Sequence, residues 1–198
     1  MERESIFRSL INDISGVAIE IGTCWGGFSE FLANNGKFNH LFCVDPYKVY
    51  PKEIYNDALN TMSQSECNEK HRIVEERLRN LSNSKKMQIT LLREESEKAS
   101  FSFADNSVSF IYVDGNHHYS EVLKDLCFWW IKVKQGGVLA GDDVEPDVTH
   151  KDGNLFITHQ PGSYGVYGVR TALNHFKKLV PSFNPIIIGS QFFAIKNF

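Results

Sequence analysis

Short apolar runs of strand length alternate with stretches of helical spacing along most of this chain, and that alternation limits the folds it can adopt. A parallel sheet covered by helices on both faces has this pattern. The predicted strands are residues 17–21, 40–44, 87–92, 108–113 and 138–140. The predicted helices are residues 28–34, 53–81, 122–133 and 166–179. The sequence therefore predicts a doubly wound α/β fold.

Two segments differ from this rhythm. Residues 53–81 are polar and charge-rich, and they predict one or two surface helices interrupted near Cys67 and Asn68. Residues 142–165 are polar and contain several glycines and prolines, which predicts a long loop. Because long loops in compact domains often carry function, we expect this one to form a lid that faces the substrate.

The last apolar runs of the sequence, residues 185–188 and 192–195, are separated by a Gly-Ser-Gln turn. This pattern predicts a terminal antiparallel hairpin. No internal repeat and no Pro/Ser-rich linker divides the 198 residues, of which 42% are hydrophobic and 23% charged, an ordinary globular composition. We therefore expect one domain over residues 1–198.

Charge and hydropathy exclude two classes of partner. The net charge is −3 and the basic residues are scattered, so no basic stripe is available to neutralise a run of phosphates. No apolar run approaches the roughly 18 residues of a membrane-spanning helix, and the first residues lack the apolar core of a signal peptide. We expect no nucleic-acid partner, no membrane partner and a cytoplasmic location.

A glycine-rich segment follows the first predicted strand, where residues 20–27 read Glu-Ile-Gly-Thr-Cys-Trp-Gly-Gly. Glycine at a strand-to-helix junction lets the backbone turn sharply and approach a ligand, which indicates a nucleotide-like ligand. A dinucleotide-binding fingerprint would need glycine where Cys24 stands, so the segment argues against a nicotinamide oxidoreductase. A tight turn without any ligand is the alternative interpretation.

Asp45 ends the second predicted strand. A carboxylate at this point can accept hydrogen bonds from both ribose hydroxyls of an adenosine, as in dinucleotide-binding folds. An Asp-Pro turn with Pro46, or a helix cap, is the alternative.

Acidic residues follow the fourth and fifth predicted strands. Asp114 comes directly after one, and Asp142 and Asp143 come after the other. Adjacent carboxylates are costly unless a cation or hydrogen bonds compensate their charge. These three residues offer hard oxygen ligands at neighbouring strand ends, which predicts a Mg²⁺ or Mn²⁺ site. Alternatively, Asp142 and Asp143 cap the following loop and Asp114 touches only the cofactor.

Two histidines, His117 and His118, follow Asp114 closely. An imidazole has an ordinary pKa of about 6.5, so either could remove a proton from a substrate hydroxyl as a general base. We favour His117 as the base or as an orienting group, and an exposed structural histidine is the alternative for each.

Taken together, residues 20–27, Asp45, residues 95–96, residues 114–119 and residues 137–143 resemble, in the right order, the class I S-adenosylmethionine-dependent methyltransferases, and within them the macrocin O-methyltransferase-like branch. The resemblance implies a mostly parallel seven-stranded sheet in the order 3-2-1-4-5-7-6 with a C-terminal antiparallel hairpin. The cofactor-binding residues that it implies are Glu20, Gly22, Thr23, Trp25, Gly26, Asp45, Glu95, Ser96, Asp114 and His117. Two residues depart from the family pattern, because Glu94 replaces a glycine and Asn116 replaces an acid.

The same resemblance implies methylation of an acceptor hydroxyl, most often on a sugar or glycan, with a divalent metal. The catalytic residues would then be His117, Asp114 and Asp143. A catechol-type metal-dependent O-methyltransferase and a non-catalytic cofactor-binding subunit are the alternatives. A small-molecule or glycan acceptor is the expected partner, and a homodimer is compatible with the sequence.

Overall fold

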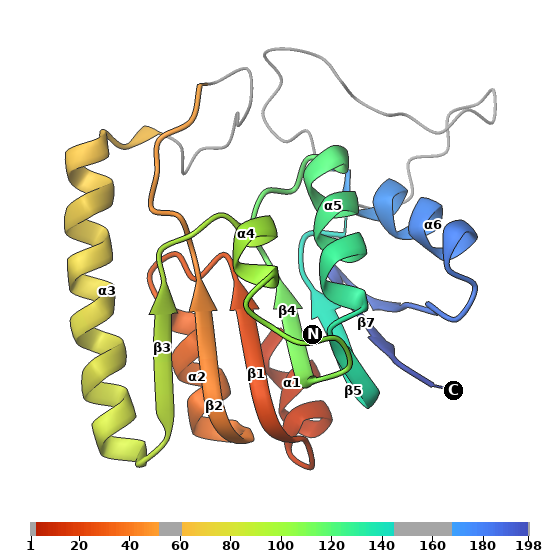
Figure 1. Cartoon of the computed structure of the whole chain (residues 1–198), viewed down its shortest axis with the longest axis horizontal. Helices are drawn as coiled ribbons and strands as arrows, with labels where there is room; N and C mark the ends of the chain where they lie inside the picture. Colours follow the sequence, from red (N-terminus) through yellow and green to blue (C-terminus); the bar gives the residue numbers. More distant parts are fainter. Residues whose placement is uncertain (1–2, 52–60, 145–167, 198) are drawn as a thin grey trace.

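Strands and helices alternate through most of the computed structural model, which describes residues 3–51, 61–144 and 168–197 (Figure 1). The strands are β1 (Ser15–Ile21), β2 (Lys37–Val44), β3 (Gln88–Leu92), β4 (Val108–Val113), β5 (Val133–Gly141), β6 (Ile186–Ile188) and β7 (Gln191–Ile195). The helices are α1 (Arg3–Ile11), α2 (Gly27–Asn35), α3 (Gln64–Lys85), α4 (Ser96–Ser100), α5 (Tyr119–Trp130) and α6 (Val169–Leu179). None of these helices has the length and apolarity needed to cross a membrane.

The strands form one seven-stranded sheet in the order β3-β2-β1-β4-β5-β7-β6. Strands β1 to β5 pair in parallel, whereas β7 is antiparallel to both β5 and β6. A tight turn through Gly189, whose φ of 62° favours glycine, joins the last two strands. The predicted strand order and terminal hairpin are both confirmed.

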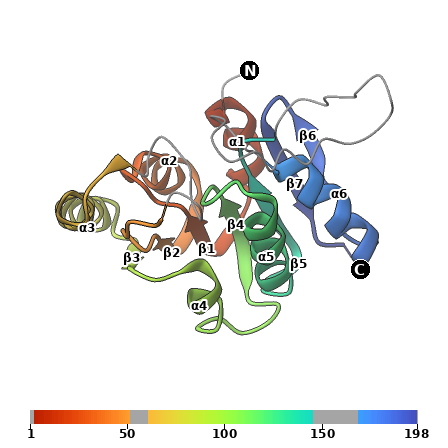
Figure 2. The same ribbon diagram turned by 90° about the horizontal axis from the view of Figure 1, so that it is seen from above.

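Helices cover both faces of the sheet, as the view along the strands in Figure 2 shows. Helices α1, α2 and α3 pack on one face, around a core that includes Phe7, Phe28 and Leu78. Helices α4, α5 and α6 pack on the other face, around Trp129 and Phe176. All six residues of β4 are buried because this strand lies at the centre of the sheet, with helices on both sides. The fold is therefore the predicted doubly wound α/β type.

Helix α1 was not predicted from the sequence. It is short and polar on one side, but Ile6, Phe7 and Ile11 are buried against the sheet. The Phe7 ring makes edge-to-face contacts with the rings of Phe28, Phe110 and Tyr112, which holds the helix in place. Long-range packing of this kind leaves little local signal in a nine-residue segment.

The predicted interruption near Cys67 and Asn68 was wrong. Both residues lie inside the first turns of the continuous helix α3. The helix begins at a capping box, in which the Ser63 hydroxyl accepts a hydrogen bond from the backbone N–H of Glu66 while the Glu66 carboxylate accepts one from the N–H of Ser63. This cap sets the start of the helix.

Strand β5 begins earlier than predicted. Helix α5 ends at Trp130, so Val133 belongs to the strand and not to the helix. The pairing of β4 with β5 shifts register between Val108 and Phe110, and Gly136 (φ 69°) lies in the irregular part of β5. Gly136 therefore lies inside the strand. Residues 145–165 of the predicted lid lie outside the described residues.

Candidate active site

The carboxyl ends of β1, β2, β4 and β5 meet at the upper edge of the sheet in Figure 1. A cavity of about 810 Å³ opens along this edge, which is where open α/β sheets bind their ligands. The predicted site residues that line it are Glu20, Gly22, Thr23, Trp25, Asp45, Glu95, Ser96, Asp114, His117 and Asp143. Gly26 and Asp142, both in the described part of the chain, do not line it.

Gly22 brings the loop after β1 against the end of β4. Its φ is 88°, and a Cβ atom at this position would lie 1.9 Å from the backbone oxygen of Asp114. Only glycine fits such a close approach. Gly26, with a φ of 75°, is the N-cap of α2, so its role is to turn the chain into the helix. The glycine motif therefore shapes one wall of the cavity.

Asp45 lies at the end of β2, where its two carboxylate oxygens accept hydrogen bonds from the backbone N–H groups of Cys24 and Tyr47, each at 2.8 Å. Burial raises the pKa of Asp45, and these two hydrogen bonds oppose that shift. Each carboxylate oxygen keeps a second lone pair, so the group can still accept from a diol in the cavity.

Glu20 is a buried acid beneath the glycine loop, with 2% of its surface exposed. The Ser29 hydroxyl, on α2, donates a hydrogen bond to its carboxyl group. Burial raises the pKa of Glu20 to about 8, and the bond from Ser29 only partly offsets this. In the free protein this shift favours the protonated form of Glu20, and a cationic group bound beside it would favour the charged form.

Glu95 and Ser96 start helix α4, and both side chains already have partners. The Glu95 carboxylate accepts from Lys48 Nζ at 3.1 Å and from the Tyr50 hydroxyl at 2.5 Å. The Ser96 hydroxyl donates to a carboxylate oxygen of Asp125 at 2.5 Å and accepts from Trp129 Nε1 at 2.7 Å. The contacts of Ser96 tie the start of α4 to helix α5, and those of Glu95 tie it to the segment after β2.

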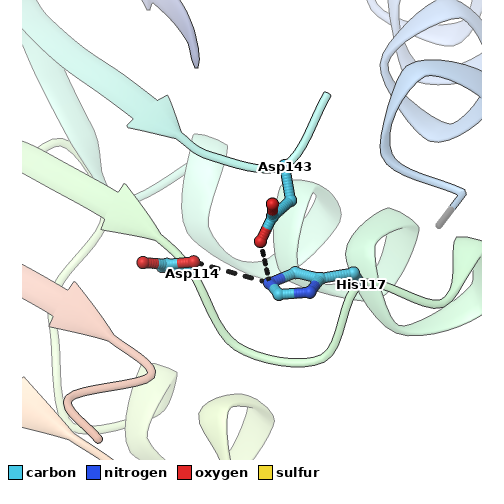
Figure 3. Close-up of side chains that lie close together, drawn as sticks. All are labelled: Asp114, His117 and Asp143. Atoms are coloured by element: carbon cyan, nitrogen blue, oxygen red, sulfur yellow. Dashed lines mark ion pairs between the residues drawn. The ribbon is translucent and has the colours of Figure 1, made fainter. Parts of the chain in front are cut away.

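Asp114, His117 and Asp143 form a compact cluster, drawn in Figure 3. The His117 Nε2 atom lies 3.4 Å from Asp114 Oδ1 and 3.3 Å from Asp143 Oδ2. One ligand atom from each residue can be chosen so that all three lie within 4.8 Å of one another. The cluster can hold a proton on the imidazole between two carboxylates, or a cation.

Asp142 is not part of this cluster. Its Oδ1 atom accepts from the Ser190 hydroxyl at 2.9 Å and from the N–H of Asp143 at 2.6 Å, and the Gln191 amide also donates to it. These bonds fasten the end of β5 to the terminal hairpin. His118 is the N-cap of α5 and lies outside the cavity lining.

Arg3 is a cavity residue that no sequence motif indicated. Its Nη1 atom lies 3.1 Å from Asp114 Oδ2 and 3.5 Å from Asp142 Oδ2, and its guanidinium carbon lies 4.6 Å from the centre of the Phe28 ring. Arg3 therefore compensates two of the three predicted metal-binding acids. Only the packing of α1 brings it there.

Lys70, from helix α3, is a second cavity residue that was missed. Its Nζ atom lies 3.1 Å from Cys24 Sγ and 5.0 Å from the centre of the Trp25 ring. Lys70 lies four residues before Val74 and eight before Leu78, which are also buried, so the helical spacing placed it on the buried face.

A family model described as a methyltransferase domain matches residues 19–144. The chain belongs to this family. The matched residues contain the glycine loop, Asp45 and the Asp114, His117 and Asp143 cluster. The fold and this family identify the chain as a methyltransferase domain.

Three similar proteins share part of the sequence or the fold. The methyltransferase is 26% identical over 157 residues to "Uncharacterized protein R132" of Acanthamoeba polyphaga mimivirus, covering 75% of this chain and 63% of that protein. A putative caffeoyl-CoA O-methyltransferase from Staphylococcus aureus has the same fold (TM-score 0.66, 14% identity, 100% of this chain and 85% of that one). So does an O-methyltransferase from Bacillus cereus in complex with SAH (TM-score 0.62, 13% identity, 98% of this chain and 80% of that one).

Proposed function

We propose that this methyltransferase transfers the methyl group of S-adenosylmethionine to a hydroxyl group of a small acceptor, and that this acceptor is a sugar or glycan. The observation that carries this proposal is the position of the Asp114, His117 and Asp143 cluster beside the glycine loop. Gly22 closely approaches the backbone of Asp114. The glycine loop, which we propose to bind the cofactor, therefore adjoins the cluster of Asp114, His117 and Asp143, which we propose to accept the proton of the acceptor.

The residues of the cavity fit the cofactor at three points. Asp45 faces the cavity with acceptor lone pairs for the ribose hydroxyls. The loop at Gly22 leaves room for the backbone to approach the methionine part. Glu20, buried beneath it, is a hydrogen-bond partner for a cationic amino group. When bound, S-adenosylmethionine supplies a methyl group on a positively charged sulfur, and its transfer leaves S-adenosylhomocysteine.

We assign the proton of the acceptor hydroxyl to His117. As the acceptor oxygen bonds to the methyl carbon, His117 Nε2 takes the hydroxyl proton. The carboxylates of Asp114 and Asp143, at 3.4 and 3.3 Å, stabilise the imidazolium that results. Alignment of the two reacting atoms in the cavity supplies much of the remaining acceleration.

A divalent cation is the second part of the proposal. Two carboxylates and an imidazole within 4.8 Å of one another suit Mn²⁺ or Mg²⁺, with the acceptor hydroxyl among the remaining ligands. Such an ion would orient and acidify that hydroxyl. Asp142 would join the set only after Arg3, which lies 3.5 Å from it, moves away.

The preference for a sugar or glycan over a flat catechol rests on polarity. Residues 145–164 include several charged, hydroxyl and amide side chains, which suit an acceptor rich in hydroxyl groups. A catechol would instead call for a flat apolar slot beside the cluster.

Calorimetric titration with S-adenosylhomocysteine, followed by methyl-transfer assays on a panel of sugars and catechols, tests the proposal. The assays are run with Mg²⁺, with Mn²⁺ and with a chelator. Transfer that the chelator abolishes supports the cation at Asp114, His117 and Asp143. Transfer that survives the chelator but is lost in His117→Gln assigns the proton to His117 alone. A protein that does not bind S-adenosylhomocysteine would overturn the proposal.

A further inference from the structure

Asp125, on helix α5, is a buried carboxyl group that lines the same cavity and has no role in the function described so far. Its exposed fraction is 8%. A carboxyl group is rarely buried to this extent without partners, because the loss of water disfavours its charged form. Burial raises the pKa of Asp125 to about 7, in spite of the hydrogen bond from Ser96.

A short chain of hydrogen bonds fixes the Asp125 carboxyl group. Trp129 Nε1 donates to Ser96 Oγ at 2.7 Å, which directs the Ser96 hydroxyl proton to Asp125 Oδ1 at 2.5 Å. Within the described residues, Ser96 provides the hydrogen bond that Asp125 accepts, and Oδ2 receives no donor from them. The group is therefore held in one orientation with an acceptor atom left for a ligand.

Glu95 is the other acid at this end of the cavity, and each of its oxygens already has a donor. Its Oε1 atom accepts a hydrogen bond from Lys48, and its Oε2 atom accepts one from Tyr50. A ligand at Glu95 would have to share an oxygen with one of these donors. Among the described residues, no donor reaches Asp125 Oδ2, so a ligand there shares that atom with none of them.

The position of Asp125 relative to Asp45 indicates which part of the cofactor it meets. Asp45 follows β2 and Ser96 follows β3, and the two strand ends adjoin, because the N–H of Asp45 donates to the Leu92 carbonyl at 3.1 Å. With the ribose at Asp45 and the methionine part at the glycine loop, the part of the cavity lined by Glu95 and Ser96, at the start of α4, would be left for the base. Ser96 and Asp125 meet at that point.

We propose that Asp125 accepts a hydrogen bond from the exocyclic amino group of adenine, and so makes the methyltransferase select adenine over a base with an oxo group. This inference rests on the proposed function, because it takes the glycine loop and Asp45 as the sites of the methionine part and the ribose. Ser96 and Trp129 act as positioning residues that orient the Asp125 carboxylate.

The test compares two nucleosides that differ at this group, S-adenosylhomocysteine and S-inosylhomocysteine, by calorimetry. Above pH 8, where Asp125 is charged, we expect the wild type to bind the adenine compound on the order of tenfold to a hundredfold more tightly, the range for a hydrogen bond to a charged group. In Asp125→Asn, the amide oxygen keeps the bond from Ser96 while the amide nitrogen becomes a donor. The preference should therefore fall by roughly tenfold or more or reverse.

The exposed Asp13→Asn is the matched control, since Asp13 pairs only with Lys37 among the described residues; it should retain the wild-type preference. The proposal would be overturned if Asp125→Asn kept the wild-type preference, or if it lost affinity for both compounds equally. It would also be overturned if Glu95→Gln lost the preference for the adenine compound. If Asp125→Asn does not fold, the wild type still decides, because equal affinity for the two compounds contradicts base selection. A wild type that binds neither compound overturns the proposed function itself, together with this inference.

Discussion

At the scale of single residues, the site depends on how Asp114 shares its charge. One carboxylate oxygen faces Arg3 at 3.1 Å and the other faces His117 at 3.4 Å. Arg3 also approaches Asp142, so one guanidinium compensates two neighbouring acids. The Arg3 guanidinium thus lies beside the site proposed for a metal ion.

Arg3→Met should change stability and metal affinity in opposite directions. Without the guanidinium, Asp114 and Asp142 repel each other, so we expect a loss of about 1 kcal/mol for these partly exposed groups, measured by urea unfolding with a chelator. Removal of the competing cation should tighten Mn²⁺ binding, measured by titration. Arg8→Met, which removes an exposed arginine from the same helix, is the control. Weaker Mn²⁺ binding in Arg3→Met would contradict this account.

Glu20→Gln should change how stability depends on pH. In the native state Glu20 keeps its proton up to a pKa of about 8, while its ordinary value is 4.5, so the folded form binds more protons between these two values. Stability of the free wild type should therefore fall as pH rises from about 5 to 8, and level off above. Glutamine cannot ionise, so the thermal midpoint of the variant should gain on the wild type over this interval. A constant difference between pH 5 and pH 8 would refute the assignment.

Asp45→Ala and Asp143→Ala should separate cofactor binding from turnover. The first removes the ribose acceptor, and we expect roughly a tenfold or greater loss of S-adenosylhomocysteine affinity. The second removes one side of the cluster around His117, and affinity should stay near that of the wild type while kcat collapses. Calorimetry and a methyl-transfer assay measure the two effects. Unchanged affinity in Asp45→Ala would sink the ribose assignment.

At the scale of elements, helix α1 connects the first core to the site. Phe7 is fully buried against Phe28, Phe110 and Tyr112, and Arg3 lies one turn earlier on the same helix. The packing of the Phe7 ring thus holds α1 in a position from which the Arg3 guanidinium contacts Asp114.

Phe7→Ala should destabilise the protein by about 3–5 kcal/mol, because the removed ring leaves a cavity among three other rings. Urea unfolding measures the loss. In the same variant Arg3 is no longer held at Asp114. Adding Arg3→Met to it should therefore change the Mn²⁺ affinity less than Arg3→Met does in the wild type. Ser9→Ala, on the exposed side of α1, should cost well under 1 kcal/mol. A Phe7→Ala variant as stable as the wild type would show that α1 is not part of the folded unit.

At the scale of the whole molecule, the cavity joins segments from most of the sheet, because β1, β2, β3, β4 and β5 all end at its rim. A ligand that bridges them should therefore stabilise the entire fold. S-adenosylhomocysteine at about 100 times its Kd should add roughly 2.7 kcal/mol, which corresponds to roughly 5–10 °C in the thermal midpoint for a chain of this size. NAD at the same concentration should give no shift, and an equal shift with NAD would contradict the cofactor assignment.

Local patterns in the sequence were enough to predict the arrangement of the sheet and the strand ends at the site. Periodicity is a local property, so the alternation of strands and helices could be identified directly. Once the strands are parallel, their carboxyl ends share one edge, which places Gly22, Asp45 and Asp114 around one cavity. The turn between β6 and β7 is equally local, so the hairpin was predictable too.

The tertiary structure decided which of these groups act together. Asp142 and Asp143 are neighbours in the chain, but hydrogen bonds from the terminal hairpin turn Asp142 away from His117. Arg3 reaches Asp114 only because α1 packs on the sheet, and Asp125 faces the cavity only because α5 lies against Ser96. Side-chain direction and helix packing depend on contacts between residues far apart in the sequence, and no local pattern encodes them.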